Sequence, residues 1–153
     1  MTPDQVRFLD QARTAVLATI DPAGRPRLVP ICFVVQGGSD AGMTVWTPLD
    51  DKPKRVTDPH GLARVRDILD RPEVSLLVDR WDEDWTRLAW LRVYGWAEIV
   101  DPGGAGRADP ARARRTDAIR ALRAKYPQYA DHDLESRPLI RIEPTEASSW
   151  GDL

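Results

Sequence analysis

Three basic side chains stand close together after a short apolar stretch, where they could bind an anion. Lys52, Lys54 and Arg55 follow the expected strand 43–47 and precede a helix that we expect to begin at Asp58. Ammonium and guanidinium groups form charge-assisted hydrogen bonds to phosphate, and the amides at a helix N-terminus favour negative charge. The pattern therefore makes this basic turn a candidate phosphate site. A solvated run of charges is the alternative, and spacing alone favours it.

The stretch before the basic turn predicts a strand with a defect in it. Residues 27–35 are nearly all apolar and rich in β-branched side chains, which predicts a strand covered on both faces. Pro26 and Pro30 lack the N–H that a sheet ladder needs, so Pro30 indicates an edge, a bulge or an interruption. A ligand could approach the backbone at such a gap.

The order of these parts resembles a known family. The strand Arg27-Leu28-Val29-Pro30-Ile31, a strand ending in Trp46-Thr47, a short turn and then Lys52-x-x-Arg55 are similar to the split β-barrel proteins of the pyridoxamine 5′-phosphate oxidase superfamily. Within that superfamily, the chain resembles the small flavin- and deazaflavin-dependent oxidoreductases. The residues that this resemblance places at a cofactor are Val29, Pro30 and Ile31 at the ring edge, Trp46 and Thr47 beside it, and Lys52 and Arg55, assisted by Lys54, at the phosphate.

The resemblance also implies a reaction. A hydride would pass between a flavin-type cofactor and a small organic substrate, with the deazaflavin coenzyme F-420 expected first and FMN second. A cofactor- or haem-binding protein without turnover is the alternative, because split barrels also have those roles. Oxidation of pyridoxamine phosphate itself is not expected, since the tail after Ile142 does not align with the arginine-rich substrate motif of the true oxidases.

Other catalytic chemistries lack their residues. His60 and His132 are the only histidines, and no residue that would activate the thiol stands near Cys32, so a hydrolytic triad is not expected. There is no CxxC motif, and the two histidines do not stand close together in the sequence as a zinc-binding pair would. We expect Cys32 to be a buried, unreactive thiol in a reducing compartment. An oxidoreductase remains compatible, because a cofactor can carry the hydride itself.

The rest of the pattern predicts one domain, 1–153, of mainly β structure with helices (α+β). The expected fold is a split β-barrel, FMN-binding-like, of about six antiparallel strands with flanking helices. Helices are predicted after Thr2-Pro3, over 58–69 and over 110–126, where we expect the arginines Arg112, Arg114 and Arg115 to form a solvated face. Further strands are predicted over 15–20, 74–81, 86–100 and 138–143, with Trp150 in the tail.

The strand 86–100 has two faces, of which one is unusually aromatic. Trp90, Tyr94 and Trp96 share the face opposite Leu91 and Val93. Large exposed apolar patches normally mark an interface, so this face predicts a two-fold homodimer with the cofactor in a groove between subunits. Coverage by the helix 110–126 of the same subunit is an equally weighted alternative.

Composition narrows the partners. The formal net charge of −2 gives no overall attraction to nucleic acid or to an anionic membrane. No apolar run approaches the ~20 residues of a membrane span, and the first residues are polar and acidic. The sequence therefore predicts a cytoplasmic protein that acts on a small molecule.

Overall fold

A computed structural model describes residues 1–38, 42–49, 58–103 and 110–153, and for residues 110–112 it describes the backbone only. Within these ranges the protein is α+β, and its strands form one antiparallel sheet in the order β2-β1-β5-β6-β7-β4-β3. The strands are β1 (Ala15–Ile20), β2 (Pro26–Ile31), β3 (Val34–Gln36), β4 (Thr44–Pro48), β5 (Glu73–Arg80), β6 (Ala89–Val100) and β7 (Leu139–Gly151). The α-helices are α1 (Pro3–Gln11), α2 (Ala63–Asp70) and α3 (Pro110–Lys125).

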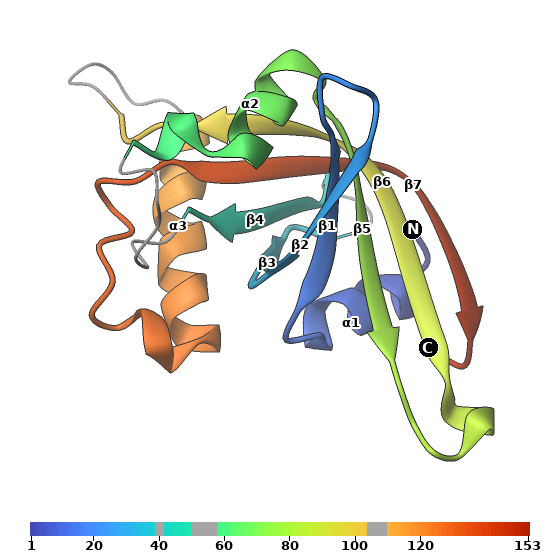
Figure 1. Ribbon diagram of the computed structural model, residues 1–153. Coiled ribbons are helices and arrows are strands. Elements are labelled where there is room, and N and C mark those ends of the chain that lie inside the picture. The colour runs from blue at the N-terminus through green and yellow to red at the C-terminus, as the bar shows by residue number, and fades with distance from the viewer. Residues whose placement is uncertain (39–41, 50–57, 104–109) are drawn as a thin grey trace.

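The sheet is strongly curled, and its two edges belong to one stretch of chain (Figure 1). β2 is one edge strand and β3 the other, yet only Cys32 and Phe33 separate them in sequence. Residues before this break pair with β1, and residues after it pair with β4. The stretch 26–36 therefore joins both edges of the curled sheet, which gives the predicted split barrel. Counted as one interrupted strand, it also accounts for the expected number of about six.

The expectation that 27–35 is covered on both faces was wrong. β2 is an edge strand whose residues are mostly exposed, and Leu28 keeps 66% of its surface accessible. The apolar composition reflects an outward face that no helix of the described chain covers, rather than a central strand. The positions of Pro26 and Pro30 in β2 confirm the prediction that Pro30 marks an edge, where one side of the backbone needs no ladder partner.

A tyrosine from α3's end supplies hydrogen bonds at the break in the strand. The Phe33 N–H donates to the Tyr126 hydroxyl at 3.1 Å, and that hydroxyl lies 2.8 Å from the Phe33 carbonyl and 2.9 Å from the Arg13 carbonyl, to either of which it can donate. Buried backbone groups need such partners, and no strand supplies them here. Burial also raises the pKa of Tyr126, which keeps the phenol protonated. Tyr126 therefore stabilises the interruption itself.

The helices pack around the sheet at different places. α1 lies between β3 and β6, α2 lies against β1 and β6, and α3 lies against β3 (Figure 1). The predicted N-terminal helix is confirmed, with Thr2 and Gln5 forming a capping box. Asp58 caps only a short 3-10 turn, Pro59–Gly61, whereas the α-helix begins at Ala63. The predicted start of an α-helix at Asp58 was therefore wrong.

The long strand β6 confirms the predicted alternation, since its inward residues are buried and its outward residues are largely exposed. β7 is longer than expected and continues to Gly151, so Trp150 lies in the sheet opposite Trp90 and not in a tail. A register shift at Tyr94 and Gly95 bends these two strands. A Cβ on Gly95 would lie 2.6 Å from the Glu143 carbonyl oxygen, so the bend requires glycine.

α3 does not cover the aromatic face of β6, so that alternative was wrong. The helix instead buries Ala118, Ile119 and Leu122 in a second core with Trp46 and Leu139. The first core fills the barrel interior. Tyr94 and Trp96 remain 37% and 51% exposed. Among the described residues, the outward face of β1, β2, β5 and β6 therefore has no covering helix.

We expect Tyr126→Phe to lower the free energy of unfolding by about 1–3 kcal/mol, because it leaves the buried Phe33 N–H without its acceptor. Tyr94→Phe is the matched control, since Tyr94 is partly exposed and should change stability by less than about 0.5 kcal/mol. Urea denaturation followed by circular dichroism measures both. Equal losses in the two variants would contradict the role of the Tyr126 hydroxyl.

Candidate functional site

A hollow of about 230 Å³ opens where the strand 26–36 is interrupted. The residues that line it come from four parts of the chain and are Thr14, Pro30, Ile31, Cys32, Thr47, Pro48, Arg64 and Tyr129. β2 ends at Ile31 and β4 ends at Pro48, so two strand ends meet here. The hollow brings together Pro30, Ile31 and Thr47 from the set that the sequence placed at a cofactor.

Two other members of that set lie elsewhere. Trp46 has no exposed surface, and its indole N–H donates to the Thr44 hydroxyl at 3.1 Å. It packs with α3 because successive side chains of a strand point to opposite faces, and its neighbour Thr47 faces the hollow. Val29 is half-buried against the barrel interior and does not line the hollow. The hollow therefore takes only the last two residues of each strand, Pro30 and Ile31 of β2 and Thr47 and Pro48 of β4.

The predicted basic turn cannot be placed. Lys52, Lys54 and Arg55 lie outside the described residues. The described chain on either side ends at the buried Leu49 and resumes at Asp58.

Arg64 is a basic residue of the hollow that the sequence reasoning missed. It lies in the first turn of α2 and is half-buried, whereas Arg66 on the same helix is exposed. No local signal separates them, because only the packing of α2 against the barrel turns Arg64 toward the strand ends.

An ion pair fixes α2 in this position. The buried carboxylate of Asp67 accepts hydrogen bonds from the Thr19 hydroxyl and from the Arg27 guanidinium, both at 2.8 Å. These contacts tie α2 to β1 and β2 together. Arg64 lies one turn earlier on the same helix, so the Asp67 contacts also hold Arg64 near Pro30 and Ile31.

The hollow is suited to an anion rather than a cation. Arg64 is the charged side chain that lines it among the described residues, and no carboxylate does so. The thiol of Cys32 is half-buried at its wall, so the expected fully buried cysteine is partly open to the site. Nearby, the Lys125 ammonium donates to the Asp10 carbonyl at 2.8 Å, and burial lowers its pKa. The Arg64 guanidinium favours a phosphate-like group, whereas the lowered pKa of Lys125 makes that amine less able to add positive charge.

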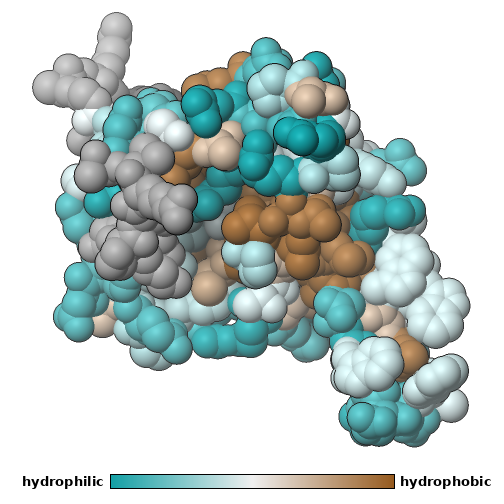
Figure 2. Space-filling view, viewed as in Figure 1, coloured by the Kyte–Doolittle hydropathy of each residue, from teal (hydrophilic) through white to brown (hydrophobic). Residues whose placement is uncertain are grey.

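An apolar face adjoins the hollow along β2. Figure 2 shows apolar surface gathered over the middle of β1, β2 and β5, with paler aromatic side chains beyond it. Leu28, Leu77 and Trp96 are exposed on this outward face. The Arg92 guanidinium lies 5.3 Å from the centre of the Tyr94 ring, which places a cation over this aromatic surface.

The part of the chain that the structure describes has neither a metal-binding cluster nor a membrane-spanning helix. It contains no group of three or more His, Cys, Asp or Glu side chains that could hold a metal ion. None of its helices is long and apolar enough to cross a membrane.

Comparison with solved structures shows the same fold in several proteins. A conserved hypothetical protein from Mycobacterium tuberculosis is 21% identical with a TM-score of 0.72, over 99% of this chain and 85% of that one. An F-420 reductase is 19% identical with a TM-score of 0.64, over 97% and 98%. The haem storage protein HutZ from Vibrio cholerae is 18% identical with a TM-score of 0.60, over 97% and 92%. At these identities the likeness is one of fold.

Sequence comparison identifies the family. No curated protein matches the chain by sequence. The family model described as pyridoxamine 5′-phosphate oxidase matches residues 1–151, which is nearly the whole chain. With the curled antiparallel sheet and its interrupted strand, this match means that the chain belongs to the pyridoxamine 5′-phosphate oxidase family.

Proposed function

We propose that the protein is an oxidoreductase that binds a flavin-type cofactor, with the cofactor's phosphate near Arg64 and its ring along β2. The observation that carries this proposal is the hollow at the interrupted strand, where Pro30, Ile31 and Thr47 meet a guanidinium. The family, which includes oxidoreductases, supports the same reaction class. When bound, the cofactor would supply the hydride chemistry, while the protein binds and orients it.

The residues present fit such a cofactor. Arg64 provides positive charge, Thr47 provides a buried hydroxyl, and the edge strand β2 leaves backbone groups without a strand partner. At about 230 Å³ the hollow is smaller than a usual ligand pocket of ~300–1,000 Å³. It would therefore hold the phosphate-bearing end, and the ring would extend over the open face beside Pro30 and Leu28.

Coenzyme F-420 is our first choice of cofactor and FMN our second. The structural likeness to an F-420 reductase supports this order. Binding of haem without turnover is the competing function, and the likeness to a haem storage protein supports it. No histidine lines the hollow among the described residues, although Cys32 and Tyr129, which are of types that can also hold haem iron, do so. The family, which includes oxidoreductases, favours the flavin-type cofactor.

We also propose that a second copy of the chain covers the outward face of β1, β2, β5 and β6 and forms a homodimer. Leu28, Leu77 and Trp96 are exposed there without a covering helix. Apolar surface of this extent normally marks an interface. Because this face adjoins the hollow at Pro30, a partner would close a groove over the ring of the cofactor.

We expect Arg64→Ala to weaken binding of F-420 or FMN at least about tenfold, because a hydrogen bond to a charged group contributes ~1.5–3 kcal/mol. Arg66→Ala is the control, since Arg66 lies on the same helix but is exposed. Calorimetric titration with both cofactors, and with haem, measures the affinities. Binding to haem alone would replace the oxidoreductase proposal with haem handling, and binding to none of the three would refute both.

The basic turn provides an independent test. Lys52→Ala with Arg55→Ala should lower cofactor affinity at least about a hundredfold, because two charge-assisted hydrogen bonds to phosphate are lost. Arg112→Ala with Arg114→Ala should matter little, since Arg114 is exposed and the sequence predicts both arginines on a solvated face, where charges contribute only ~0–1 kcal/mol. Calorimetry of both double variants decides. Equal losses would indicate a diffuse basic surface, and no loss in either would indicate a solvated turn.

The interface can be tested with two matched leucines. Leu28 is 66% exposed on β2 and Leu69 is 62% exposed on α2. Replacing either by Glu therefore adds one negative charge at a similarly exposed position. We expect the wild type and Leu69→Glu to be dimers in light scattering at micromolar concentration, and Leu28→Glu to be a monomer. A monomer mass for the wild type would rule out the homodimer.

A further inference from the structure

The segment between α3 and β7 is held to α3 by its backbone carbonyls rather than by regular secondary structure. Residues 127–138 contain only the short 3-10 turn Pro127–Tyr129. Arg115, predicted to be solvated, is in fact only 7% exposed. Its guanidinium donates to the carbonyls of Leu134 at 3.0 Å, Glu135 at 3.0 Å and Arg137 at 2.6 Å. One terminal nitrogen, Nη2, is therefore shared among three carbonyls that lie outside any strand or helix.

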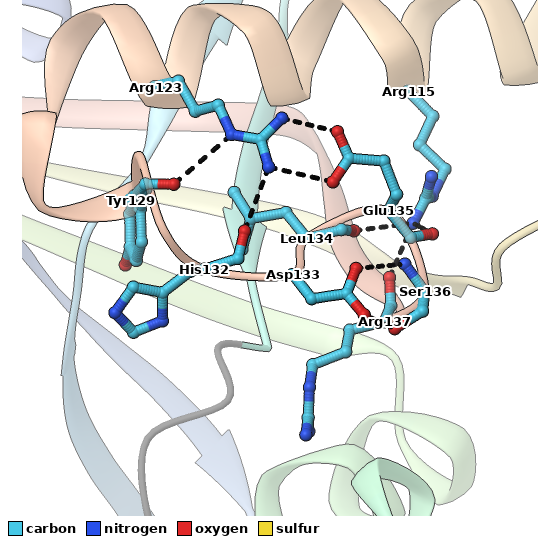
Figure 3. A network of polar contacts seen from close by, with 9 residues as sticks. All are labelled: Arg115, Arg123, Tyr129, His132, Asp133, Leu134, Glu135, Ser136 and Arg137. Atoms are coloured by element: carbon cyan, nitrogen blue, oxygen red, sulfur yellow. Dashed lines mark hydrogen bonds and ion pairs between the residues drawn. The ribbon is translucent and has the colours of Figure 1, made fainter.

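A second arginine, Arg123, contacts residues 129–135 of the same segment. Arg123 forms a two-pronged ion pair with the Glu135 carboxylate at 2.5 and 2.9 Å (Figure 3). Its guanidinium also donates to the carbonyls of Tyr129 at 3.3 Å and His132 at 3.0 Å. The hydrogen bond from Arg123 holds the pKa of Glu135 below its usual range, so this pair is charged at neutral pH. We call Arg123 and Glu135 the clamp.

The clamp determines where Tyr129 lies. Figure 3 shows the Tyr129 carbonyl directed toward Arg123 and its ring directed away from the Arg123–Glu135 pair. The ring makes edge contacts with Tyr126, at 5.8 Å between centres, and with His132, at 5.5 Å. It is 4% exposed and lines the hollow beside Cys32 and Arg64.

We infer that residues 127–138 form a separately fastened wall of the hollow, and that the clamp is a positioning device that sets Tyr129 against the ligand. Tyr129 and Cys32 line the hollow together and pack in the same apolar cluster, so release of the wall would open both the hollow and the thiol. That the ligand is a phosphate-bearing aromatic cofactor rests on the proposed function. The inference that the wall covers Cys32 is independent of the proposed function.

The chain contains a matched ion pair without this geometry. Arg120 lies one turn before Arg123 on α3 and pairs with Asp117 at 2.8 Å, with both side chains exposed. That pair joins two residues of the same helix. Among the described residues, Arg120 donates no hydrogen bond to a carbonyl of the segment 127–138. The same replacement at Arg120 therefore makes the same chemical change to the helix as at Arg123 but leaves the wall fastened.

The test uses Cys32 as a reporter, since it is the only cysteine. Arg123→Lys keeps the charge but loses the planar fork that reaches Glu135 and two carbonyls at once. We expect the rate of iodoacetamide alkylation of Cys32, measured by mass spectrometry on the full chain, to rise several-fold, because local opening governs access. Arg120→Lys should react at the wild-type rate. Equal rates in all three proteins would overturn the inference.

Cofactor titration separates the wall from the proposed function. If F-420 or FMN binds, Arg123→Lys should raise its Kd several-fold and Arg120→Lys should not, and saturating cofactor should slow alkylation of Cys32. If the wild type binds neither cofactor, the proposed function fails while the alkylation rates still decide the inference. Should Arg123→Lys fail to fold, as judged by circular dichroism, Glu135→Gln takes its place, with Asp117→Asn as its control.

Discussion

The Tyr126 hydroxyl and the backbone of Phe33 form the contact on which the site depends. A barrel strand that stops pairing with one neighbour before it starts pairing with the next leaves buried amide and carbonyl groups, and such groups are costly unless they are hydrogen-bonded. A single phenol acts as acceptor for one of them and lies within donor distance of the other. The barrel can therefore stay open at Cys32 without the loss of stability that an unsatisfied break would cause.

This opening couples the two cores of the molecule. β2 borders the barrel interior, whereas β3 and β4 contribute side chains to both cores, and the hollow lies where the stretch 26–36 is interrupted between them. Tyr126 belongs to the second core but also bonds to Arg13, just before β1. The geometry of the hollow thus depends on how α3 packs, although none of the described side chains of α3 lines it.

The arginines of this chain differ in their roles because their surroundings differ. Arg115 is buried, and its Nη2 lies within hydrogen-bond distance of three backbone carbonyls of the segment 127–138. Arg64 faces a hollow that no carboxylate lines among the described residues, which suits anion binding. Arg120 forms an exposed pair on a helix surface, and such pairs contribute little. Helical spacing alone treats all three alike.

The sequence by itself determined which stretches form most of the helices and strands, because hydrophobic periodicity and capping are local signals, but not where α2 begins or where β7 ends. It also indicated an edge, a bulge or an interruption at Pro30, since a missing N–H acts locally, and the structure shows the edge. Only the tertiary structure decided that Leu28 faces outward, that Arg115 is buried and that Arg64 and Tyr129 join Pro30 and Thr47. These outcomes depend on which elements from distant parts of the sequence pack together, and an apolar or basic side chain carries no local sign of which neighbour will cover it.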